Sequence, residues 1–413
     1  MKLLIVNQPL YNKGDSAAHK GFLRTLKQLL PNADIEVVLA NANDEAIKEF
    51  SVTGVKYSAT SYIDSSKLIT YLQRLFYRFF LLLKIQKLAL LFPYLNVLSK
   101  KIQAADAIIC APGGICMGGF RNWSHICILW IAKYFHKPVF YYSRSIGPFS
   151  DKGWSNKLFK KNSISLLKYF SFISLRDSKS AKFTDELGIE YMQTVDPVFL
   201  NTPVNHISLE QDFKLTNSFV VFVPNRLTWQ YTYRNVPQER IDSFYLQIMK
   251  LLAKRFAGMD ILMLPQLFGV NRGDHAYFEQ LKEKSKMENV VVLPENISSD
   301  IQQALISKAS LVIGARYHSV VFAINNCVPF ISLSYEHKMN GLLESLDKLN
   351  CSFDLTKIST TKWNENEAVA EIEQMMAMAK PDLEAREKAH VIAQNCIEKM
   401  VEQIKKEERG FKI

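Results

Sequence analysis

Short apolar runs alternate with longer amphipathic stretches along almost the whole chain of 413 residues. Continuous short apolar runs are typical of strands buried on both faces of a parallel sheet, whereas the amphipathic stretches repeat apolar residues with the period of a helix. An alternation of strands and helices implies crossover connections, and crossover connections join parallel strands. The pattern therefore predicts an α/β protein.

The apolar runs form two series, and the chain is too long for one ordinary hydrophobic core. We therefore expect two Rossmann-like domains that face each other across a cleft. The predicted strands are Lys2–Val6, Ile35–Leu39, Ala107–Cys110, Val139–Tyr142, Phe172–Leu175 and Tyr191–Thr194 in the first series, and Phe219–Val223, Ile261–Leu264, Val290–Leu293, Leu311–Ile313 and Phe330–Leu333 in the second. The predicted helices include Ala17–Leu30, Gln238–Phe256 and Asp274–Lys286.

Composition shifts along the chain mark the expected domain boundaries. The polar stretch 201–217 shows no strong period and predicts a linker between an N-terminal domain, 1–200, and a C-terminal domain, 218–360. The charged, helical stretch 361–413 is expected to pack back on the N-terminal domain.

A helical insert at about 60–104 interrupts the N-terminal domain with a basic and aromatic sequence. Lys67, Arg74 and Arg78 share one helical face, whereas Lys84 and Lys87 drift off it. Basic residues beside Phe and Leu suit a helix that lies in a membrane interface, and residues 67–92 are the candidate. An amphipathic helix packed on its own domain is the other interpretation. No stretch reaches the ~20 apolar residues of a membrane-spanning helix.

The chain carries 51 Lys and Arg against 40 Asp and Glu, a formal net charge of +11. This excess favours nucleic acid, an anionic membrane or a phosphorylated substrate. Nucleic acid is disfavoured, because the charge is spread out and no recognised motif is present. The six cysteines form no CxxC pair, which predicts free thiols in a reducing compartment and no zinc site. Residues 3–6 are too short a run for a signal peptide, so we expect a cytoplasmic protein.

The first loop, NKGDSAA at residues 12–18, joins the first strand to a helix. Gly14 permits a tight turn, and Asp15 or Ser16 could cap the helix. The free N–H groups of the helix start could equally bind a ligand. Both interpretations remain open from the sequence.

Two further loops of the N-terminal domain follow predicted strands. Gly113 and Gly114 would let a substrate approach the backbone closely, and Arg144 follows the strand Val139–Tyr142 at the same edge. The glycines form neither a P-loop nor a GxGxxG motif, so no nucleotide-binding fingerprint is present.

Four cationic or titratable side chains follow predicted strands of the C-terminal domain: Arg226, Arg316, His318 and Lys338. Arg316 and His318 also stand at the start of a helix, whose dipole favours an anion. A guanidinium binds an anion with two hydrogen bonds, and a protonated imidazole can donate a proton. This set predicts an anion-binding site.

Six ordered motifs give the chain its resemblance to a known family: NKGDSAAHKG, APGG, SIGP, LRDSKS, TVDPVF and ARYHSVVFAINNCVPFISLSYEHK. They cover roughly residues 5–350, and the last is the most specific. With these motifs the sequence resembles the polysaccharide pyruvyl transferases. The resemblance implies a two-domain glycosyltransferase B-like (GT-B-like) fold. It also implies transfer of the three-carbon unit of phosphoenolpyruvate to a sugar, with a pyruvate ketal formed and phosphate released.

The resemblance assigns roles to the candidate residues. Donor binding falls to the C-terminal domain, and acceptor binding to the loops of the N-terminal domain. The donor set is Arg226, Arg316, His318, Tyr335 and Lys338, and the acceptor set is Asn12, Gly14, Asp15, Gly113, Gly114 and Arg144. The long basic insert and the sequence YSRS before SIGP depart from the family pattern and bear on acceptor choice.

The hypothesis for the chemistry gives His318 the role of general acid and Asp15 that of orienting or deprotonating the acceptor. The sequence demands no metal, and no cofactor is expected besides the donor substrate phosphoenolpyruvate. The acceptor is expected to be a saccharide, carried on a lipid. The protein would then be held at the cytoplasmic face of the membrane. Two rivals stay open. One is a GT-B glycosyltransferase that uses a nucleotide sugar, with Glu336 as its ribose-binding carboxylate, and the other is an inactive membrane-surface partner in polysaccharide assembly.

Overall fold

The computed structural model describes residues 1–60, 71–72, 75–76, 78–80, 83, 86–118, 121–202, 218–269 and 273–410. The chain divides into two compact units. Unit 1 comprises Met1–Leu10, Ala18–Leu200 and Val391–Ile413, and unit 2 comprises Tyr11–Ala17 and Asn201–His390. Each unit is built on its own parallel sheet.

The sheet of unit 1 has the order β3-β2-β1-β4-β6-β7-β8, with β5 paired to β6. All its pairings are parallel. Its strands are β1 (Lys2–Val6), β2 (Asp34–Ala40), β3 (Lys56–Thr60), β4 (Ala107–Cys110), β5 (Gly113–Gly118), β6 (Val139–Gly147), β7 (Phe172–Leu175) and β8 (Met192–Gln193). The order reverses direction between β1 and β4, as in a Rossmann fold.

Helices connect these strands in crossover fashion. They are α1 (Lys13–Leu29), α2 (Asp44–Phe50), α4 (Pro93–Ala104), α5 (Trp123–Tyr134), α6 (Trp154–Leu167) and α7 (Ser178–Glu186), with 3₁₀ helices at Gln86–Leu91 and Pro197–Leu200. Asp177 caps α7 by accepting a hydrogen bond from the N–H of Ser180, and Arg176 forms a buried ion pair with Asp196. Both contacts lie within the fold of unit 1 and stabilise it.

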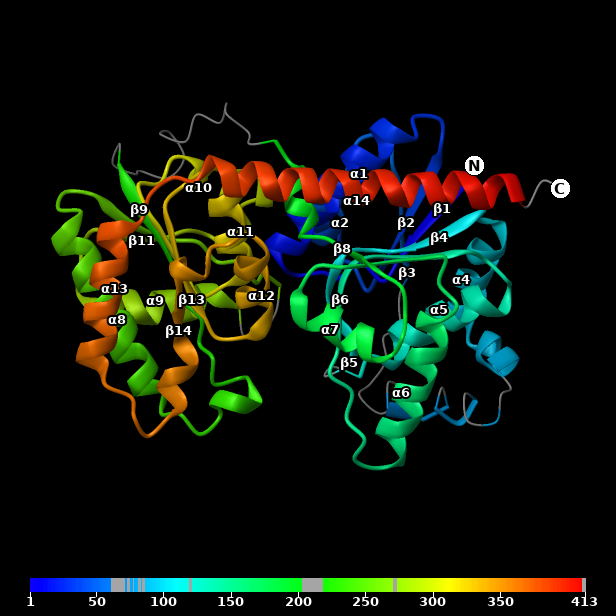
Figure 1. Ribbon diagram of the computed structural model, residues 1–413, viewed down its shortest axis with the longest axis horizontal. Helices are drawn as coiled ribbons and strands as arrows, with labels where there is room; N and C mark the ends of the chain where they lie inside the picture. The colour runs from blue at the N-terminus through cyan, green and yellow to red at the C-terminus, as the bar shows by residue number, and fades with distance from the viewer. Residues whose placement is uncertain are drawn as a thin grey trace. The chain divides into compact units, whose positions relative to one another are not determined.

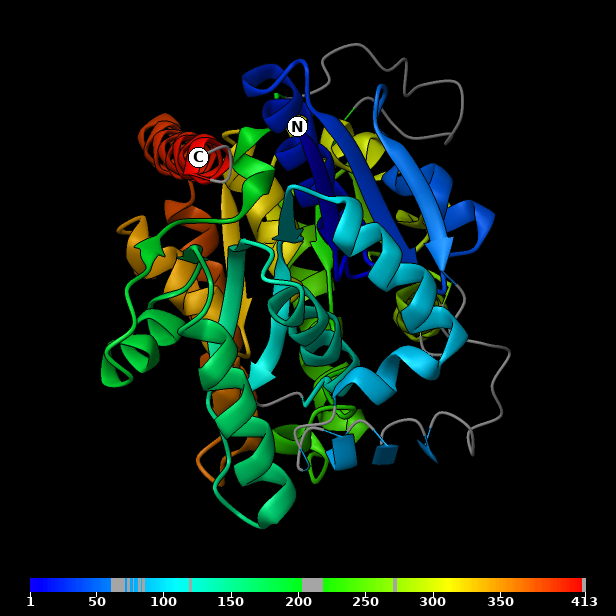
Figure 2. The same cartoon turned by 90° about the vertical axis from the view of Figure 1, so that its right-hand side faces the viewer.

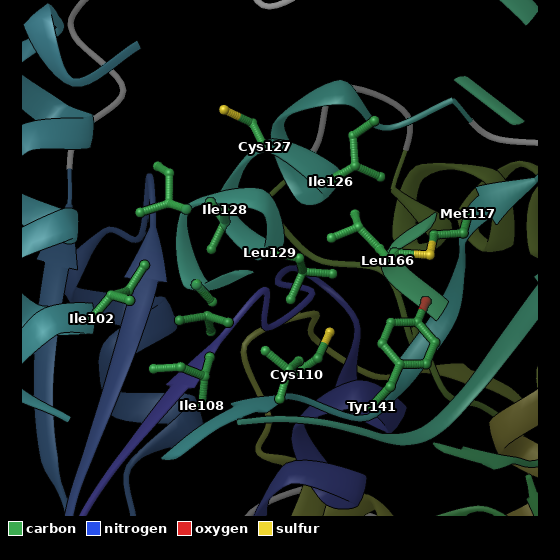
Figure 3. Close-up of a cluster of buried hydrophobic side chains, with 14 of the residues drawn as sticks. Ile102, Ile108, Cys110, Met117, Ile126, Cys127, Ile128, Leu129, Tyr141 and Leu166 are labelled. Carbon is green, nitrogen blue, oxygen red and sulfur yellow. The ribbon is translucent and has the colours of Figure 1, made fainter. Parts of the chain in front are cut away.

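A buried apolar cluster holds the helices α4 and α5 against the sheet of unit 1. Leu98 and Ile102 come from α4, Leu129 from α5 and Ile108 from β4, and each is fully buried. Figure 3 shows Ile102, Ile108 and Leu129 gathered in this cluster. Burying such a side chain contributes about 1.5–3 kcal/mol, so the cluster fixes the sheet that carries the loops.

Unit 2 repeats the same architecture with the sheet order β11-β10-β9-β12-β13-β14, all parallel. Its strands are β9 (Phe219–Val223), β10 (Asp260–Met263), β11 (Val290–Val292), β12 (Val312–Gly314), β13 (Phe330–Ser334) and β14 (Ser352–Asp354). Its helices are α8 (Gln238–Arg255), α9 (Asp274–Ser285), α10 (Ser299–Ser307), α11 (Tyr317–Asn325), α12 (His337–Ser345) and α13 (Glu365–Met378), with 3₁₀ helices at Tyr231–Tyr233, Leu349–Cys351 and Leu355–Ser359.

The predicted strands are present within one or two residues of their expected bounds, except that β6 runs on to Gly147. The sequence missed β3, β5 and β14. It placed Gly113 and Gly114 in a loop, but both lie in β5, which pairs with β6. Likewise Arg144, expected beyond the end of a strand, lies within β6.

The last part of the insert predicted at about 60–104 is not an insert. Residues 93–104 form α4, whose Leu95, Leu98 and Ile102 are buried in the core, so this part is a connecting helix of the unit 1 sheet. Lys67, Arg74 and Lys84 lie outside the described residues. Among the described residues, none of the helices is both long and apolar enough to cross a membrane.

The stretch 361–413 belongs to both units. In unit 2, α13 packs on α8, where Trp363 meets the Phe244 ring edge-on at 5.2 Å and Ser243 donates a hydrogen bond to Glu365. The long helix α14 (Leu383–Gly410), red in Figure 1, contributes its residues from Val391 onward to unit 1. Of the expected linker 201–217, residues 203–217 lie outside the described residues.

Candidate functional site

The loops that follow β10, β9, β12 and β13 form what we call the carboxyl edge of unit 2: residues 264–269, 224–226, 315–318 and 335–338. The strand order of this sheet reverses between β9 and β12, and open α/β sheets bind ligands at such a reversal. There Asn225 donates a hydrogen bond from its side-chain nitrogen to the carbonyl of Ala315, at 3.4 Å. The two loops at the reversal are thus joined directly.

Arg316 is the central cation of the carboxyl edge. It precedes the first residue of α11 and is only 9% exposed. Its guanidinium forms an ion pair with Asp274, the first residue of α9. The other carboxylate oxygen of Asp274 accepts hydrogen bonds from the backbone N–H groups of Gln266 and Leu267, both at 3.0 Å. One carboxylate therefore fixes both the guanidinium and the loop after β10.

Electrostatics keeps the groups around Arg316 in defined charge states. Burial opposes the charge of Arg316, but its interactions with Asp274 and with neighbouring tyrosines together raise the pKa of Arg316 above its ordinary value. Burial raises the pKa of Tyr335 well above its usual range, so this phenol is neutral. Burial would also raise the pKa of Glu336, yet Lys338, 2.8 Å away, lowers it overall. The edge thus holds a permanent guanidinium beside a neutral phenol.

His318 lies in the first turn of α11 and is 6% exposed. Gly14 approaches its ring so closely that a Cβ on Gly14 would stand 1.8 Å from the His318 Cγ. Only a residue without a side chain permits this approach. The NKGD motif near the start of the chain and the RYH motif far along it therefore meet at one point of unit 2.

Backbone pairing explains why residues 11–17 belong to unit 2. The N–H of Lys13 donates to the carbonyl of Gln266 at 2.9 Å, and the N–H of Phe268 donates to the carbonyl of Tyr11 at 3.1 Å. The hydroxyls of Ser16 and Ser299 lie 3.2 Å apart. The expectation that this loop serves the N-terminal domain is therefore corrected.

The sequence also indicated Asp15 or Ser16 as the cap of helix α1, and this prediction is wrong. The side chain of Asn12 accepts a hydrogen bond from the N–H of Gly14 at 2.8 Å, because α1 begins at Lys13, two residues before Asp15. Asp15 lies in the first turn of α1 and is partly exposed. Asp15 directly follows Gly14, the residue that approaches the His318 ring.

Two residues of this site were missed from the sequence, Lys13 and Asp274. Lys13 is 1% exposed, and its ammonium lies 4.0 Å from the centre of the Phe268 ring, as in a cation–π contact. A lysine in a polar loop predicts a solvated side chain, so only its position between Asn12 and Gly14 could have drawn attention to it. Asp274 was visible as the start of a helix, but its partner Arg316 could not be seen.

Arg226 and Lys338 are on the carboxyl edge, but each has a partner there. Arg226 donates to the side chain of Gln280 at 3.0 Å and lies 5.2 Å from the ring centre of Tyr277, so it is turned toward α9. Lys338 is paired with Glu336. Of the four side chains expected to form the anion site, Arg316 and His318 lie at the start of α11, and the ammonium of Lys338 lies 5.6 Å from the ring centre of Tyr317, the first residue of that helix.

The candidates of unit 1 surround one fully buried guanidinium, that of Arg144. It donates to the carbonyls of Ala111, Asn7 (3.3 Å) and Gly114 (3.2 Å). Asn7 follows β1 and Ala111 follows β4, so Arg144 joins the two strands where this sheet reverses its order. Arg144 therefore supports the loops and is not itself exposed to an acceptor.

The two glycines beside Arg144 differ in their surroundings. A Cβ on Gly113 would stand 2.6 Å from the Pro9 ring, whereas no atom lies within 4 Å of the place of a Cβ on Gly114. Gly114 thus faces open space and Gly113 does not. These acceptor candidates belong to unit 1, whereas Asn12, Gly14 and Asp15 belong to unit 2. In the described part of the chain, no three His, Cys, Asp or Glu side chains gather as metal ligands would.

Solved structures with the same fold include a sugar-nucleotide epimerase and a second protein bound to UDP. The UDP-GlcNAc 2-epimerase of Neisseria meningitidis, bound to UDP-GlcNAc, is 12% identical with a TM-score of 0.57, covering 98% of this chain and 100% of the epimerase. MnaA of S. aureus, bound to UDP, is 11% identical with a TM-score of 0.58, covering 98% and 95%. At such identities the likeness concerns the fold alone, and the fold is the expected GT-B-like one.

Comparison of sequences identifies the family to which the chain is related. The amylovoran biosynthesis protein AmsJ of Erwinia amylovora is 20% identical over 369 residues, which cover 84% of this chain and 86% of AmsJ. The sequence model that describes polysaccharide pyruvyl transferases matches residues 12–337, from the loop that carries Gly14 to the loop after β13. The chain therefore belongs to the polysaccharide pyruvyl transferase family.

Proposed function

We propose that the protein transfers the pyruvyl unit of phosphoenolpyruvate to a sugar and forms a pyruvate ketal. The observation that carries this proposal is the buried guanidinium of Arg316, held by Asp274 beside His318 at the reversal of the unit 2 sheet. Phosphoenolpyruvate carries a carboxylate and a phosphate. A guanidinium and a helix N-terminus both favour such anions, and the buried ammonium of Lys13 adds positive charge in the same unit.

The proposed chemistry has three steps. His318, as the general acid, gives a proton to the methylene carbon of phosphoenolpyruvate, and the central carbon becomes an oxocarbenium-like electrophile. One sugar hydroxyl adds to that carbon and loses its proton, for which Asp15 is the candidate acceptor. The C–O bond to phosphate then breaks, and a second hydroxyl closes the ketal and gives its proton to the departing phosphate. The proton on Asp15 returns to His318 through solvent and resets both groups. The products are the ketal and inorganic phosphate, so atoms and charges balance.

Arg316 and Lys338 have distinct roles in this proposal. Arg316 is permanently charged and prearranged by Asp274, so it can stabilise developing negative charge on phosphate without reorganisation. Lys338 and Tyr335 border the donor from the loop after β13, and Arg226 is available from the loop after β9 once it leaves Gln280. Gly114 and its neighbours in unit 1 would serve the acceptor.

The acceptor we propose is a saccharide of exopolysaccharide or capsule assembly, built on a lipid carrier. Support for polysaccharide assembly comes from the name of the relative AmsJ and from the family description. A lipid-linked acceptor would require the protein to work as a peripheral protein at the cytoplasmic face of the membrane. The basic, aromatic insert is compatible with such a location.

Titration calorimetry with phosphoenolpyruvate tests the donor assignment. The informative variant is Arg316→Lys rather than Arg316→Ala, because removing the charge would leave Asp274 buried without a counterion, at a cost of about 3–5 kcal/mol in stability. Lysine keeps the charge, but its single ammonium cannot bind Asp274 and an anion at the same time as the planar guanidinium of arginine can. We expect binding of phosphoenolpyruvate by the wild type and at least a tenfold weaker affinity in Arg316→Lys.

Matched measurements separate this function from its rivals. Arg240→Lys, on α8, alters an arginine outside the carboxyl edge and should leave binding intact. His318→Gln should bind phosphoenolpyruvate yet lose turnover if His318 is the acid. Tight binding of a nucleotide sugar, with none of phosphoenolpyruvate even when an acceptor is present, would instead favour the glycosyltransferase, in which Glu336 would contact the ribose. Binding without turnover on any saccharide would favour an inactive partner in assembly.

A further inference from the structure

An apolar hollow opens on unit 1 between the insert and the start of α6. Its volume is about 400 Å³, and it is lined by Leu72, Leu75, Phe76, Arg78, Phe79 and Trp154. We call this the insert surface. Phe79 is 52% exposed and Trp154 is 63% exposed, although side chains of this kind are normally buried. Figures 1 and 2 both show the short helical pieces of the insert, in blue, beside α6, in green.

The insert surface is anchored from beneath, so its exposed side chains have a defined orientation. Phe80 and Phe92 pack against the core of unit 1, with their ring centres 6.4 Å apart. The guanidinium of Arg78 lies 5.2 Å from the ring centre of the buried Trp123 on α5. These anchors hold one side of the insert against the domain and leave Phe79 exposed, whereas Phe76 is 45% exposed and its ring also contacts Phe80 and Phe92.

The charge around the insert surface is mainly positive. Among the described residues from 71 to 105, Arg78, Lys87, Lys100 and Lys101 are basic and none is acidic, although Lys101 is paired with Glu36 of β2. On the adjoining α6 and the residues before it, Lys152, Lys157 and Lys161 are exposed, and Asp151 is paired with Lys160 at 2.9 Å. Whatever covers the insert surface must therefore be both apolar and anionic.

An anionic bilayer meets both conditions. A second copy of the chain in a two-fold dimer would place this same surface against itself and bring the cations together. Anionic lipids instead offer hydrocarbon chains for the hollow and negative headgroups for the surrounding Lys and Arg. We propose that the insert surface docks on the interface of an anionic membrane, with a lipid acyl chain in the hollow and Trp154 at its rim. This inference does not depend on the proposed reaction.

Sedimentation of the full-length protein with vesicles tests the inference. With about 30% phosphatidylglycerol in phosphatidylcholine we expect binding, with pure phosphatidylcholine little binding, and at about 0.5 M NaCl release from the anionic vesicles. The double variant Phe76→Glu, Phe79→Glu should bind anionic vesicles at least tenfold more weakly. The control is Met378→Glu on α13, where the side chain is 70% exposed in unit 2, and this variant should bind like the wild type.

Fluorescence locates the contact. Phosphatidylcholine brominated on its acyl chains, mixed with phosphatidylglycerol, should quench wild-type emission, and Trp154→Phe should lose the quenched component. Because the substituted side chains are exposed, circular dichroism and phosphoenolpyruvate affinity should be unchanged in these variants. Undiminished vesicle binding by the double variant, or the same quenching in Trp154→Phe, would overturn the proposal. A wild-type dimer in light scattering that the double variant abolishes would mean that a second copy covers the surface.

Discussion

At position 14 the missing side chain is what lets two distant parts of the chain meet. A Cβ there would stand 1.8 Å from Cγ of His318 and 2.3 Å from its Cβ. Such distances lie far below van der Waals contact, so one of the two residues would have to move. Gly14 is helical and not in a left-handed conformation, which means that space rather than backbone geometry demands glycine here.

Gly14→Ala should therefore displace His318 and lower both stability and turnover, the latter by at least a hundredfold if His318 is the acid. Thermal melting and a phosphate-release assay would measure the two effects. In a His318→Gly background, which removes the clashing Cβ as well as the ring, adding Gly14→Ala should cost almost no further stability. An equal cost in both backgrounds would contradict the contact. Gly114→Ala, which meets no atom within 4 Å, is the control for stability.

His19 of unit 1 makes a prediction about pH. Burial, with a smaller contribution from Lys20, lowers the pKa of His19 to about 3, whereas an unfolded histidine titrates near 6.5. Below pH 6.5, His19 therefore becomes protonated in the unfolded state but stays neutral in the folded state. This site contributes its full stability above pH 6.5 and loses it as the pH falls toward 3, by about 1.4 kcal/mol per pH unit.

Urea unfolding of wild type and His19→Gln at pH 7, 6 and 5 would test this slope. The variant should lose stability less steeply on acidification, with a difference near 1.4 kcal/mol per pH unit between pH 6 and 5. His125 is also buried with its pKa lowered well below the ordinary value, so part of the slope should remain in the variant. Parallel curves for the two proteins would show that His19 is already protonated in the folded state.

At the scale of elements, apolar patterning predicted the strands whose residues are buried on both sides. It failed where a strand is polar, glycine-rich or very short, as in β3 (KYSAT), β5 (GGICMG) and β14 (SFD). The strand β5 exists because its backbone pairs with β6 and because Arg144 binds the carbonyl of Gly114. Such causes lie in another part of the chain, so a local pattern cannot reveal them.

The helix α14 was predicted from the sequence as a helical stretch, but the pattern could not show which of its residues contact which unit. Ile397 and Met400 are fully buried in unit 1, whereas Val391 is 64% exposed. Ile397→Ala should lower the stability of the protein by about 2–5 kcal/mol, because the vacated volume cannot fully collapse. Val391→Ala should change it by less than about 0.5 kcal/mol. Urea unfolding of both variants checks the pair, and equal effects would mean that α14 does not rest on unit 1 through Ile397.

At the scale of the whole molecule, the sequence predicted two Rossmann-like units and the strand series of each. It also predicted that Arg316 and His318 lie together, because two residues of one motif, two positions apart at the same strand end, are near each other without any long-range contact. It could not predict that Tyr11–Ala17 belongs to unit 2, because that depends on backbone hydrogen bonds to Gln266 and Phe268. Nor could it reveal the pairing of Arg316 with Asp274, which joins two different strand ends.

The division of α14 at residue 391 has a consequence for synthesis on the ribosome. Unit 1 includes Ala18–Leu200 and also Val391–Ile413, and all of residues 201–390 are translated in between. At 5–20 residues per second this interval is about 10–40 s. Throughout it, the surface that Ile397 and Met400 later cover is open to solvent and to chaperones. Nascent unit 1 should therefore become resistant to proteases only after α14 has emerged, and after the sheet of unit 2 has already been made.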